Sequence, residues 1–335
     1  MRRRDVTRAA ALTSAVLLLS ACGDSGSPDP QPTGSDGETV SSVVVGVGPT
    51  DQSRTVAQVW ALALEDAGVQ VEVREVDGGR AGYLQAVQDG EIDVYPDYTG
   101  DLYLQLRGTE SSTPSPTQEA TASANPGSFV DSLANLLGQG QQGVTDNDVE
   151  SALAEQLPTG VQMLNPAPAE NKRILAVTSA TQAKLSVNSL SELSQYCSDL
   201  TFGALVGEDQ AAVTAAAVEQ TYSCTPKDVK DFASQEEVTQ ALLDGQIDVA
   251  GLLSATPEVG DNSLKALDDN RDALVPERVI PIADQNLPDA AGQEINGISS
   301  DLDTDALILL TRMTTASTPY SPEDAAAYWY GTVRP

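Results

Sequence analysis

The chain contains one ten-residue segment twice, and this repeat constrains the fold more than any other feature. Residues 85–94 read QAVQDGEIDV and residues 240–249 read QALLDGQIDV. Each copy has apolar residues at helical spacing, then an Asp-Gly pair, then a short apolar run typical of a strand. Both copies therefore predict a helix that ends at a glycine and leads directly into a strand.

A second match lies upstream of each copy, at nearly the same spacing. Asp51-Gln52 and Asp209-Gln210 each follow a glycine-containing apolar strand signal and precede a predicted helix. Two correlated matches predict two similar α/β lobes whose strand ends face a common cleft. Chance similarity between two ordinary helix-to-strand connections is the alternative.

The first half of the chain alternates strand and helix signals, which predicts parallel strand pairing. The expected elements are a strand at 43–48, a turn at 49–52, a helix at 55–67, a strand at 69–76, a helix at 81–89 and a strand at 92–94. The next residues, Tyr95 to Thr99, are predicted to form a loop. Because ligands of open α/β sheets bind beyond the carboxyl ends of strands, we expect the functional site at this loop.

The second half repeats the alternation and then returns the chain to the first lobe. The expected elements are a helix at 146–156, a strand at 174–177, a helix at 189–196, a strand at 200–206, a turn at 207–210, helices at 211–222 and 235–244, a crossover at 273–282, and helices at 304–311 and 322–330. Asp303 and Ser321 are predicted to cap the last two helices. The returning crossover would complete a two-stranded hinge.

Asp93 and Asp248 occupy the same position in the two copies of the repeat. We interpret both carboxylates as structural groups that bond backbone N–H groups, rather than as ligand contacts.

The N-terminus has the pattern of an exported lipoprotein. Arginines precede an apolar run from Ala9 to Leu19, which is too short to span a membrane, and Leu19-Ser20-Ala21-Cys22 follows. This ending resembles the bacterial lipobox, and the resemblance implies cleavage before Cys22 and a diacylglyceryl thioether on its sulfur. An ordinary signal peptide with an incidental cysteine is the alternative.

The formal net charge is −31, and loss of the arginine-rich signal would make the chain more acidic still. Like-charge repulsion therefore argues against nucleic acid and anionic lipid head groups as partners. Solubility outside the cell is the favoured explanation, and enrichment of cations near a binding cleft is the alternative. The chain has no histidine, so histidine-based triads and metal sites are absent, and we expect neither an enzyme nor a cofactor.

Cys197 and Cys224 are the cysteines that remain after Cys22. An even pair in an exported chain predicts a disulfide, which would stabilise the fold by on the order of 3 kcal/mol. Two buried thiols are the alternative.

The run that begins at Val45 reads VGVGPTDQ, then VAQVWALALEDAGVQVEV, a Gly-Gly pair and LQAVQDGEIDVYPDYTG. It resembles the substrate-binding proteins of ABC importers for glycine betaine, choline, carnitine and related compatible solutes. The resemblance implies an α/β, two-lobed type II periplasmic-binding-protein fold, in which each lobe is a mixed sheet flanked by helices and a two-stranded hinge joins them. It also implies closure around one solute, delivery to a permease and a role in osmoprotection.

The resemblance carries expectations for the site. Such proteins cage a trimethylammonium group with aromatic rings, and Tyr98 matches the cage tyrosine of the YPxYTG motif. Other positions differ from the family pattern. Val47 or Gly48 occupies the position where the family has a lysine, Asp101 occupies the position of a threonine, and Arg173 occupies the position of a tyrosine. The position of the family's aromatic residue in the crossover falls near Glu277 or Arg278, and the position of its last cage aromatic falls near Leu252.

These departures suggest a different polar or zwitterionic solute. Arg173 would suit a carboxylate or phosphate, while Asp101 and Glu208 would accept an ammonium group or hydroxyls. The full set of expected ligand contacts is Tyr98, Thr99, Asp101, Thr50, Asp51, Arg173, Glu208, Ser254 and Arg278. A solvated surface position is the alternative for Arg173, and core packing is the preferred interpretation of Tyr95.

We therefore expect a signal at 1–21, a flexible tether at 22–41, a first lobe from 42–168 and 273–335 with a low-complexity insertion at 109–147, and a second lobe at 169–272. The expected partners are a small solute, an ABC permease and, through the lipid on Cys22, the outer face of the cell membrane. The protein is expected to be a monomer. A sensory or other non-transport lipoprotein with the same fold, or an importer component for a different polar solute, is the alternative.

Overall fold

The computed structural model describes residues 42–111, 144–205 and 209–334, and at 109–111 and 209–215 it describes the backbone alone. The predicted signal, the tether with Cys22, most of the low-complexity insertion and Glu208 lie outside the described residues. None of the described helices is both long and apolar enough to cross a membrane.

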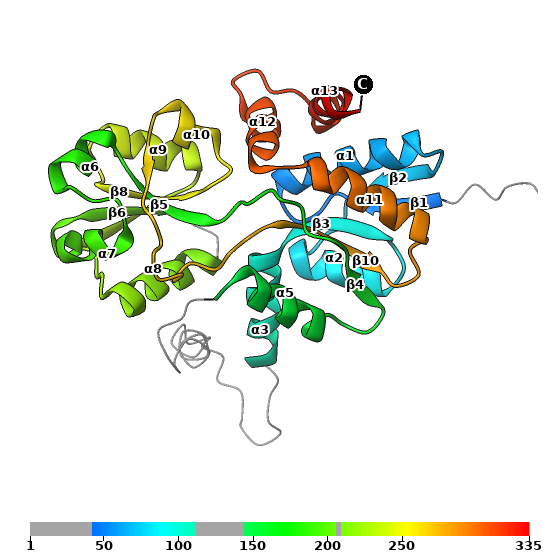
Figure 1. Ribbon diagram of the computed structural model, residues 1–335, viewed down its shortest axis with the longest axis horizontal. Helices are drawn as coiled ribbons and strands as arrows, with labels where there is room; N and C mark the ends of the chain where they lie inside the picture. Colours follow the sequence, from blue (N-terminus) through cyan, green and yellow to red (C-terminus); the bar gives the residue numbers. More distant parts are fainter. Residues whose placement is uncertain (1–41, 112–143, 206–208, 335) are drawn as a thin grey trace, which may run out of the picture. The chain divides into compact units, whose positions relative to one another are not determined.

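The described strands form two five-stranded sheets with the same spatial strand order and pairing directions (Figure 1). The first sheet has the order β2-β1-β3-β10-β4, and its strands are β1 Ser42–Gly46, β2 Gln70–Arg74, β3 Val94–Tyr98, β4 Val161–Met163 and β10 Val279–Asp284. β1 pairs in parallel with β2 and β3, whereas β10 pairs antiparallel with β3 and β4. The first lobe is thus a mixed sheet, as the sequence predicts.

The second sheet repeats this spatial strand order and these pairing directions. Its order is β7-β6-β8-β5-β9, and its strands are β5 Arg173–Val177, β6 Thr201–Leu205, β7 Asp228–Phe232, β8 Val249–Leu253 and β9 Lys265–Ala266. β6 pairs in parallel with β7 and β8, and β5 pairs antiparallel with β8 and β9. The sequence repeat therefore corresponds to two lobes with the same strand order.

Helices cover both faces of each sheet. The first lobe contains α1 Asp51–Asp66, α2 Gly79–Gln88, α3 Thr99–Ser111, α5 Asp146–Gln156, α11 Asp289–Asp301, α12 Thr304–Thr315 and α13 Pro322–Val333. The second contains α6 Ser179–Leu185, α7 Leu190–Leu193, a 3-10 helix at Ser194–Asp199, α8 Asp209–Tyr222, α9 Gln235–Leu243 and α10 Pro257–Asp261. Side chains alternate across the strands, so Val43 and Val45 pack on the side of α1 and α11, while Val44 faces the opposite cluster.

The two copies of the repeat have the same local geometry. Both helices end before a glycine with φ of +70°, Gly90 in the first copy and Gly245 in the second. Asp93 then accepts a hydrogen bond from the β1 backbone at 2.6 Å, and Asp248 accepts one from the β6 backbone at 2.9 Å. The prediction that these two aspartates bond backbone N–H groups is therefore confirmed.

Two segments connect the lobes, one between β4 and β5 and one between β9 and β10 (Figure 1). They pair antiparallel through a bridge between Glu170 and Arg278. This pairing is the two-stranded hinge that the sequence predicts.

The predicted loop at Tyr95–Thr99 is wrong, because this stretch is regular structure. β3 continues through Tyr98, all of its residues are buried, and Thr99 begins α3. Proline and aspartate are rare in strands, but the antiparallel pairing with β10 overrides this preference and sets Pro96 opposite Pro281. Tyr95 is fully buried and packs against Tyr83, with ring centroids 5.4 Å apart.

Other boundaries also differ from the predictions. Only the second half of the turn expected at 49–52 is helical, because Thr50 and Ser53 form a capping box and α1 begins at Asp51. The expected turn at 207–210 likewise includes the first residues of α8, which begins at Asp209. The predicted helix at 146–156 and the caps at Asp303 and Ser321 are confirmed.

Candidate ligand-binding site

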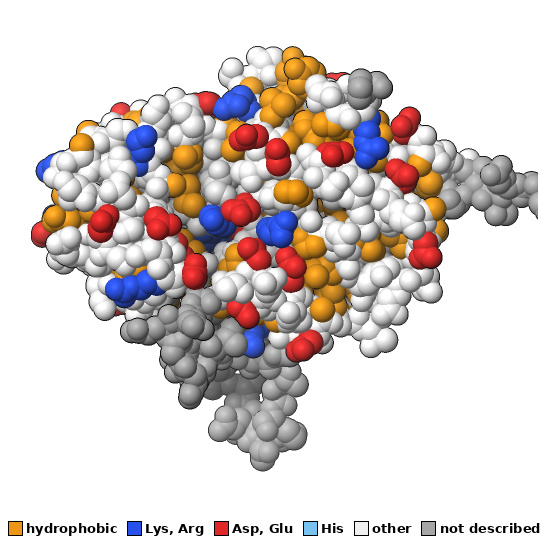
Figure 2. Space-filling model, in the orientation of Figure 1, with side chains coloured by type: hydrophobic (Ala, Val, Ile, Leu, Met, Phe, Trp, Pro, Cys, Tyr) orange, Lys and Arg blue, Asp and Glu red, His pale blue; other side chains and the backbone are white. Residues whose placement is uncertain are grey.

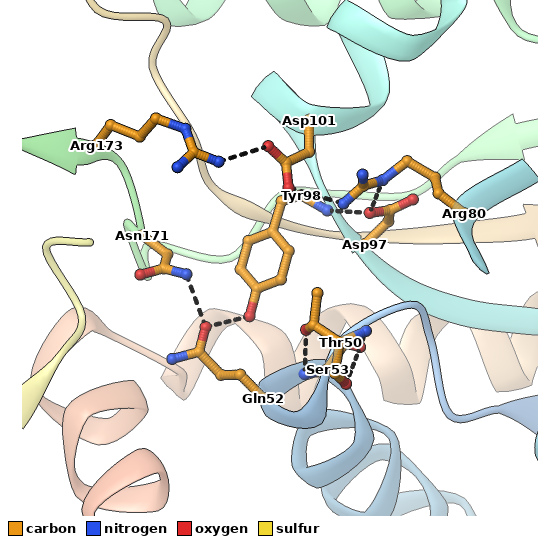
Figure 3. A network of polar contacts seen from close by, with 9 residues as sticks. All are labelled: Thr50, Gln52, Ser53, Arg80, Asp97, Tyr98, Asp101, Asn171 and Arg173. Atoms are coloured by element: carbon orange, nitrogen blue, oxygen red, sulfur yellow. Dashed lines mark hydrogen bonds and ion pairs between the residues drawn. The ribbon is translucent and has the colours of Figure 1, made fainter. Parts of the chain in front are cut away.

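Tyr98, the expected cage residue, is the last residue of β3 and is only 2% exposed. Its hydroxyl group donates a hydrogen bond to Oε1 of Gln52 in the first turn of α1 (Figure 3). The same oxygen accepts a bond of 2.9 Å from Asn171, and the Gln52 amide nitrogen donates to Thr311 at 2.6 Å. Tyr98 therefore fixes a polar junction between α1, α12 and the segment that enters the second lobe.

The phenol of Tyr98 stays protonated, because burial and then the negative charge of Glu277 raise its pKa well above the usual value. A protonated phenol can donate the bond to Gln52. The structure thus assigns to Tyr98 a hydrogen-bonding and packing role, with little ring surface left for solvent.

Arg80 lies beside this junction and bridges two carboxylates. Its Nε is 2.7 Å from Oδ1 of Asp97, and its Nη2 is 2.8 Å from Oδ2 of Asp101 (Figure 3). The Asp97 side chain is fully buried and also accepts the backbone N–H of Tyr98 at 2.8 Å. Burial raises the pKa of Asp97, and the charge of Arg80 opposes this shift. Burial would lower the pKa of Arg80, but the two carboxylates outweigh it and raise that pKa.

Asp101 connects this cluster to the second lobe. Its other oxygen, Oδ1, is 3.7 Å from Nη2 of Arg173, the first residue of β5. Glu277, on the returning hinge segment, is only 4% exposed, and Asp101, Arg173 and Arg80 act on it electrostatically. Burial raises the pKa of Glu277 well above its usual value, and the charge of Asp101 raises it further, while the charges of Arg173 and Arg80 oppose this shift.

We call Arg80, Asp97, Asp101, Arg173 and Glu277 the charged cluster. These side chains come from α2, β3, α3, β5 and the returning hinge segment, so the folded chain alone brings them together. Acidic and basic side chains also gather in the middle of the face drawn in Figure 2. The cluster has three acidic groups and two guanidinium groups, and full ionisation would leave one negative charge in excess.

Three of the expected contacts from the first lobe lie apart from the charged cluster. Thr50 caps α1, and both Thr50 and the neighbouring Asp51 are exposed. The hydroxyl group of Thr99 accepts the backbone N–H of Arg278 at 2.9 Å, and this bond fastens α3 to the returning hinge segment.

Of the remaining expected contacts, two lie at the charged cluster and two lie elsewhere. Asp101 and Arg173 form an ion pair of 3.7 Å within the charged cluster. The guanidinium group of Arg278 contacts Glu150 at 3.5 Å and the Ala167 carbonyl at 3.0 Å instead, and the Ser254 hydroxyl donates to a hinge carbonyl at 3.4 Å.

Sequence reasoning missed Arg80, Gln52, Asn171 and Glu277 as site residues. The sequence position of Arg80 could have indicated a site residue, because it follows Gly78-Gly79 just after β2, at the same sheet edge as the end of β3. Glu277 stands next to Arg278, and nothing in the sequence shows which of the two side chains turns inward.

A pocket of about 640 Å³, a volume that includes its open mouth, adjoins Arg173 within the second lobe. Its walls are mainly apolar and include Phe202, Leu205, Val218 and Leu252. The pocket contains none of Tyr98, Asp101 and Glu277, and the neighbouring α8 side chains at 209–215 lie outside the described residues. The charged cluster therefore provides the polar groups of the candidate site, and the pocket provides apolar surface next to Arg173.

Cys197 and Cys224 are joined in a disulfide, with Cα atoms 5.3 Å apart, behind the second sheet. Among the described residues, no group of three or more acidic or cysteine side chains is arranged to hold a metal ion.

Two lobes with the same strand order, joined by a paired hinge and bridged by polar side chains from both, define a two-lobed solute-binding protein. Residues 41–332 match the family described as the substrate-binding domain of the ABC-type glycine betaine transport system. The chain belongs to this family. It is the extracytoplasmic solute-binding component of an ABC importer, and this family is one of transport proteins.

Solved structures support the fold. A glycine betaine/carnitine/choline ABC transporter protein aligns with a TM-score of 0.64 and 16% identity, over 88% of this chain and 98% of its own. Apo YehZ from Escherichia coli aligns with a TM-score of 0.60 and 18% identity, over 88% and 99%. A choline-binding protein in complex with choline aligns with a TM-score of 0.52 and 14% identity, over 88% and 90%. No curated protein matches the chain in sequence.

Proposed function

We propose that this importer component binds a small solute with a positively charged head group, of the glycine betaine, carnitine or choline type, at the charged cluster between its lobes. The observation that supports this most strongly is the pair formed by Asp101 and Arg173, which contributes one charge from each lobe across 3.7 Å. A head group of the solute would meet Asp101, and the carboxylate of a zwitterion would meet Arg173.

The mode of recognition would differ from an aromatic cage. Tyr98 is buried and engaged with Gln52, so the carboxylates, rather than stacked rings, would provide most of the attraction for a cation. The apolar pocket beside Arg173 would accept the methyl groups or the chain of the solute.

We further propose that the mature protein is a monomer held at the outer face of the membrane by lipid on Cys22. The sequence ending at Ala21-Cys22 supports this proposal. Expression with a radiolabelled fatty acid should label the wild-type protein and leave Cys22→Ser unlabelled, and label on the variant would contradict the proposal.

A thermal-shift screen of the chain without its signal tests the ligand class. The panel is glycine betaine, carnitine, choline, ectoine, proline and the common amino acids. A ligand at 100 times its dissociation constant should stabilise the fold by about 2.7 kcal/mol. If no compound raises the melting temperature, the proposed function is wrong.

Two variants distinguish recognition of the cationic head group from recognition of the carboxylate. Asp101→Asn should weaken every cationic ligand, while Arg173→Gln should weaken glycine betaine more than choline, because choline has no carboxylate. Arg54→Gln is the matched control, since Arg54 pairs with exposed Glu75 on the surface. Equal losses for both ligands in Arg173→Gln would contradict the assignment of Arg173 to a carboxylate.

A further inference from the structure

A chain of hydrogen bonds crosses from the first lobe to the second through Gln52. Oε1 of Gln52 accepts a bond of 2.9 Å from the side-chain amide of Asn171 (Figure 3). Oδ1 of Asn171 in turn accepts the backbone N–H of Ala255, in the second lobe, at 3.2 Å. Ala255 is only 1% exposed and belongs to the hydrophobic cluster that contains Val43 and Trp60 of the first lobe. The second lobe is therefore bonded to the first lobe and buried against it at this point.

A second link between the lobes lies next to this chain, on α12. Nε2 of Gln52 donates to the hydroxyl group of Thr311 at 2.6 Å. The next residue, Arg312, forms a two-point ion pair with Asp261, with 2.6 Å between Nη2 and Oδ1 and 3.4 Å between Nε and Oδ2. Asp261 is the last residue of α10 in the second lobe, and α10 lies beside α12 (Figure 1). The first lobe thus contacts the second through one part-buried link and one exposed link.

The residues of the part-buried link are placed where the strands of the two sheets end. Gln52 follows β1, Tyr98 is the last residue of β3, and Ala255 follows β8. Ligands of open α/β sheets bind beyond the carboxyl ends of the strands, so this link lies on the side of the cleft. Contacts on that side form when the lobes approach each other and break when they separate. The bonds of both links involve no residue of the charged cluster, so a solute bound at the cluster leaves them intact.

On these grounds we propose that Gln52 and Arg312 are positioning residues, which hold the lobes together on the cleft side and so raise the affinity for the solute without touching it. The apparent affinity of a protein is reduced by the fraction of molecules that are not in the binding-competent arrangement. Bonds that exist only between approached lobes increase the competent fraction. The effect on affinity rests on the proposed function, whereas the contact between the lobes does not.

The two links differ in their expected response to salt. The side chains of Arg312 and Asp261 are 44% and 56% exposed, so their ion pair is screened at 1 M salt, where the Debye length is about 3 Å. The bonds of Gln52 join neutral groups and are part-buried, so salt leaves them largely unchanged. Arg312 should therefore contribute to affinity at low salt only, and Gln52 at both salt concentrations.

The first test measures the arrangement of the lobes without a ligand. Spin labels are attached to Glu65→Cys on α1 and Lys184→Cys on α6, two exposed positions, in the protein without residues 1–22, and pulsed electron spin resonance gives the distance between them. Gln52→Met and Arg312→Asp should each add a second population to the distance distribution. Exchange of the charges, in Arg312→Asp/Asp261→Arg, should restore the original distribution. An unchanged distribution in both single variants would overturn the proposal.

The second test is calorimetric titration with glycine betaine and with choline. Gln52→Met should weaken binding by about tenfold at 0.05 M and at 1 M salt, because two hydrogen bonds to Oε1 are lost. Arg312→Gln should weaken binding by about two- to fivefold at 0.05 M salt and have no effect at 1 M. Because Arg312 is exposed, its variants keep the fold and test the proposal even if Gln52→Met unfolds.

Two control variants remove similar bonds within the first lobe alone. Gln58→Met, on the same helix as Gln52, removes a bond of 3.1 Å to Glu323 of α13. Arg334→Gln removes an ion pair of 3.6 Å with Asp301, and Arg334 is 43% exposed, as Arg312 nearly is. Both controls should leave the distance distribution and the affinity unchanged at either salt concentration.

The outcomes distinguish this proposal from the proposed function. Unchanged or tighter binding in Arg312→Asp at low salt overturns the role of Arg312 and leaves the proposed function intact. Weaker binding in Gln52→Met with an unchanged distance distribution overturns the role of Gln52, because that residue would then act on the solute directly. If neither solute binds the wild type, the binding of these solutes is refuted, and the distance measurement alone decides whether these links hold the lobes together.

Discussion

Replacement of Arg80 by methionine should be one of the most damaging single changes in the first lobe. The side chain keeps a similar length, but Asp97 loses the guanidinium contact at 2.7 Å and Asp101 loses the contact at 2.8 Å. Asp97 is fully buried and, among the described residues, would keep only the backbone N–H of Tyr98 as a hydrogen-bond donor. Removing one partner of a buried ion pair typically costs about 3–5 kcal/mol, and we expect a loss of this size near pH 8.

The pH dependence of this loss tests the reasoning more sharply. Without Arg80, the pKa of Asp97, already raised by burial, should rise further. The folded variant then holds a proton that the unfolded chain has released, so its stability should fall as pH rises above about 4. The loss relative to wild type should be smaller at pH 5 than at pH 8, because protonation relieves the buried charge.

Urea unfolding followed by fluorescence of the buried Trp60 and Trp329 provides the assay. The double variant Arg80→Met/Asp97→Asn should recover most of the loss, since it removes the unpaired charge. Arg54→Met, at an exposed ion pair, should cost about 0–1 kcal/mol. A loss below about 1 kcal/mol for Arg80→Met, or an equal loss at both pH values, would refute the argument.

Three further predictions concern stability. Asp248→Ala should cost about 1–3 kcal/mol and speed hydrogen exchange at Thr201, whose N–H it leaves unpaired; unchanged exchange would contradict this. Gly203→Ala should cost about 1–3 kcal/mol in urea unfolding, because its Cβ would lie 2.5 Å from an Ile247 methyl, whereas Gly331→Ala, with open space around it in α13, should stabilise by up to about 1 kcal/mol; similar effects of the two would count against the packing argument. Reduction of the disulfide at Cys197 should lower stability by about 3 kcal/mol in the same assay, and a loss near zero would show that the bond does not constrain the unfolded chain.

Much of the fold could be predicted because its signals are local. The capping residues Asp303 and Ser321 act within one turn of their helices, and the glycines Gly90 and Gly245 end helices through their own φ angles. The roles of Asp93 and Asp248 could be inferred because the same short segment occurs twice. Such features depend on residues only a few positions away, so they can be recognised from the sequence alone.

The predicted loop after residue 94 shows where local signals mislead. Pro96 and Asp97 lower the strand propensity of this stretch, but β10, which is about 180 residues further along the chain, pairs with it and makes it a buried strand. The same pairing turns Tyr98 toward α1 and Tyr95 toward Tyr83. The side of the sheet that each tyrosine faces follows from this register, and a loop assignment could not provide it.

The sequence by itself determined two similar α/β lobes, the hinge that joins them and the importer family to which the chain belongs. Only the tertiary structure decided which charges meet: it brought Arg80, Asp101, Arg173 and Glu277 together from four separate segments and turned Arg278 toward Glu150. The physical reason is that helices, caps and turns follow from interactions over a few residues. The balance of a buried charge cluster instead depends on strand register and on close approaches such as that of Gly100 to the returning hinge segment.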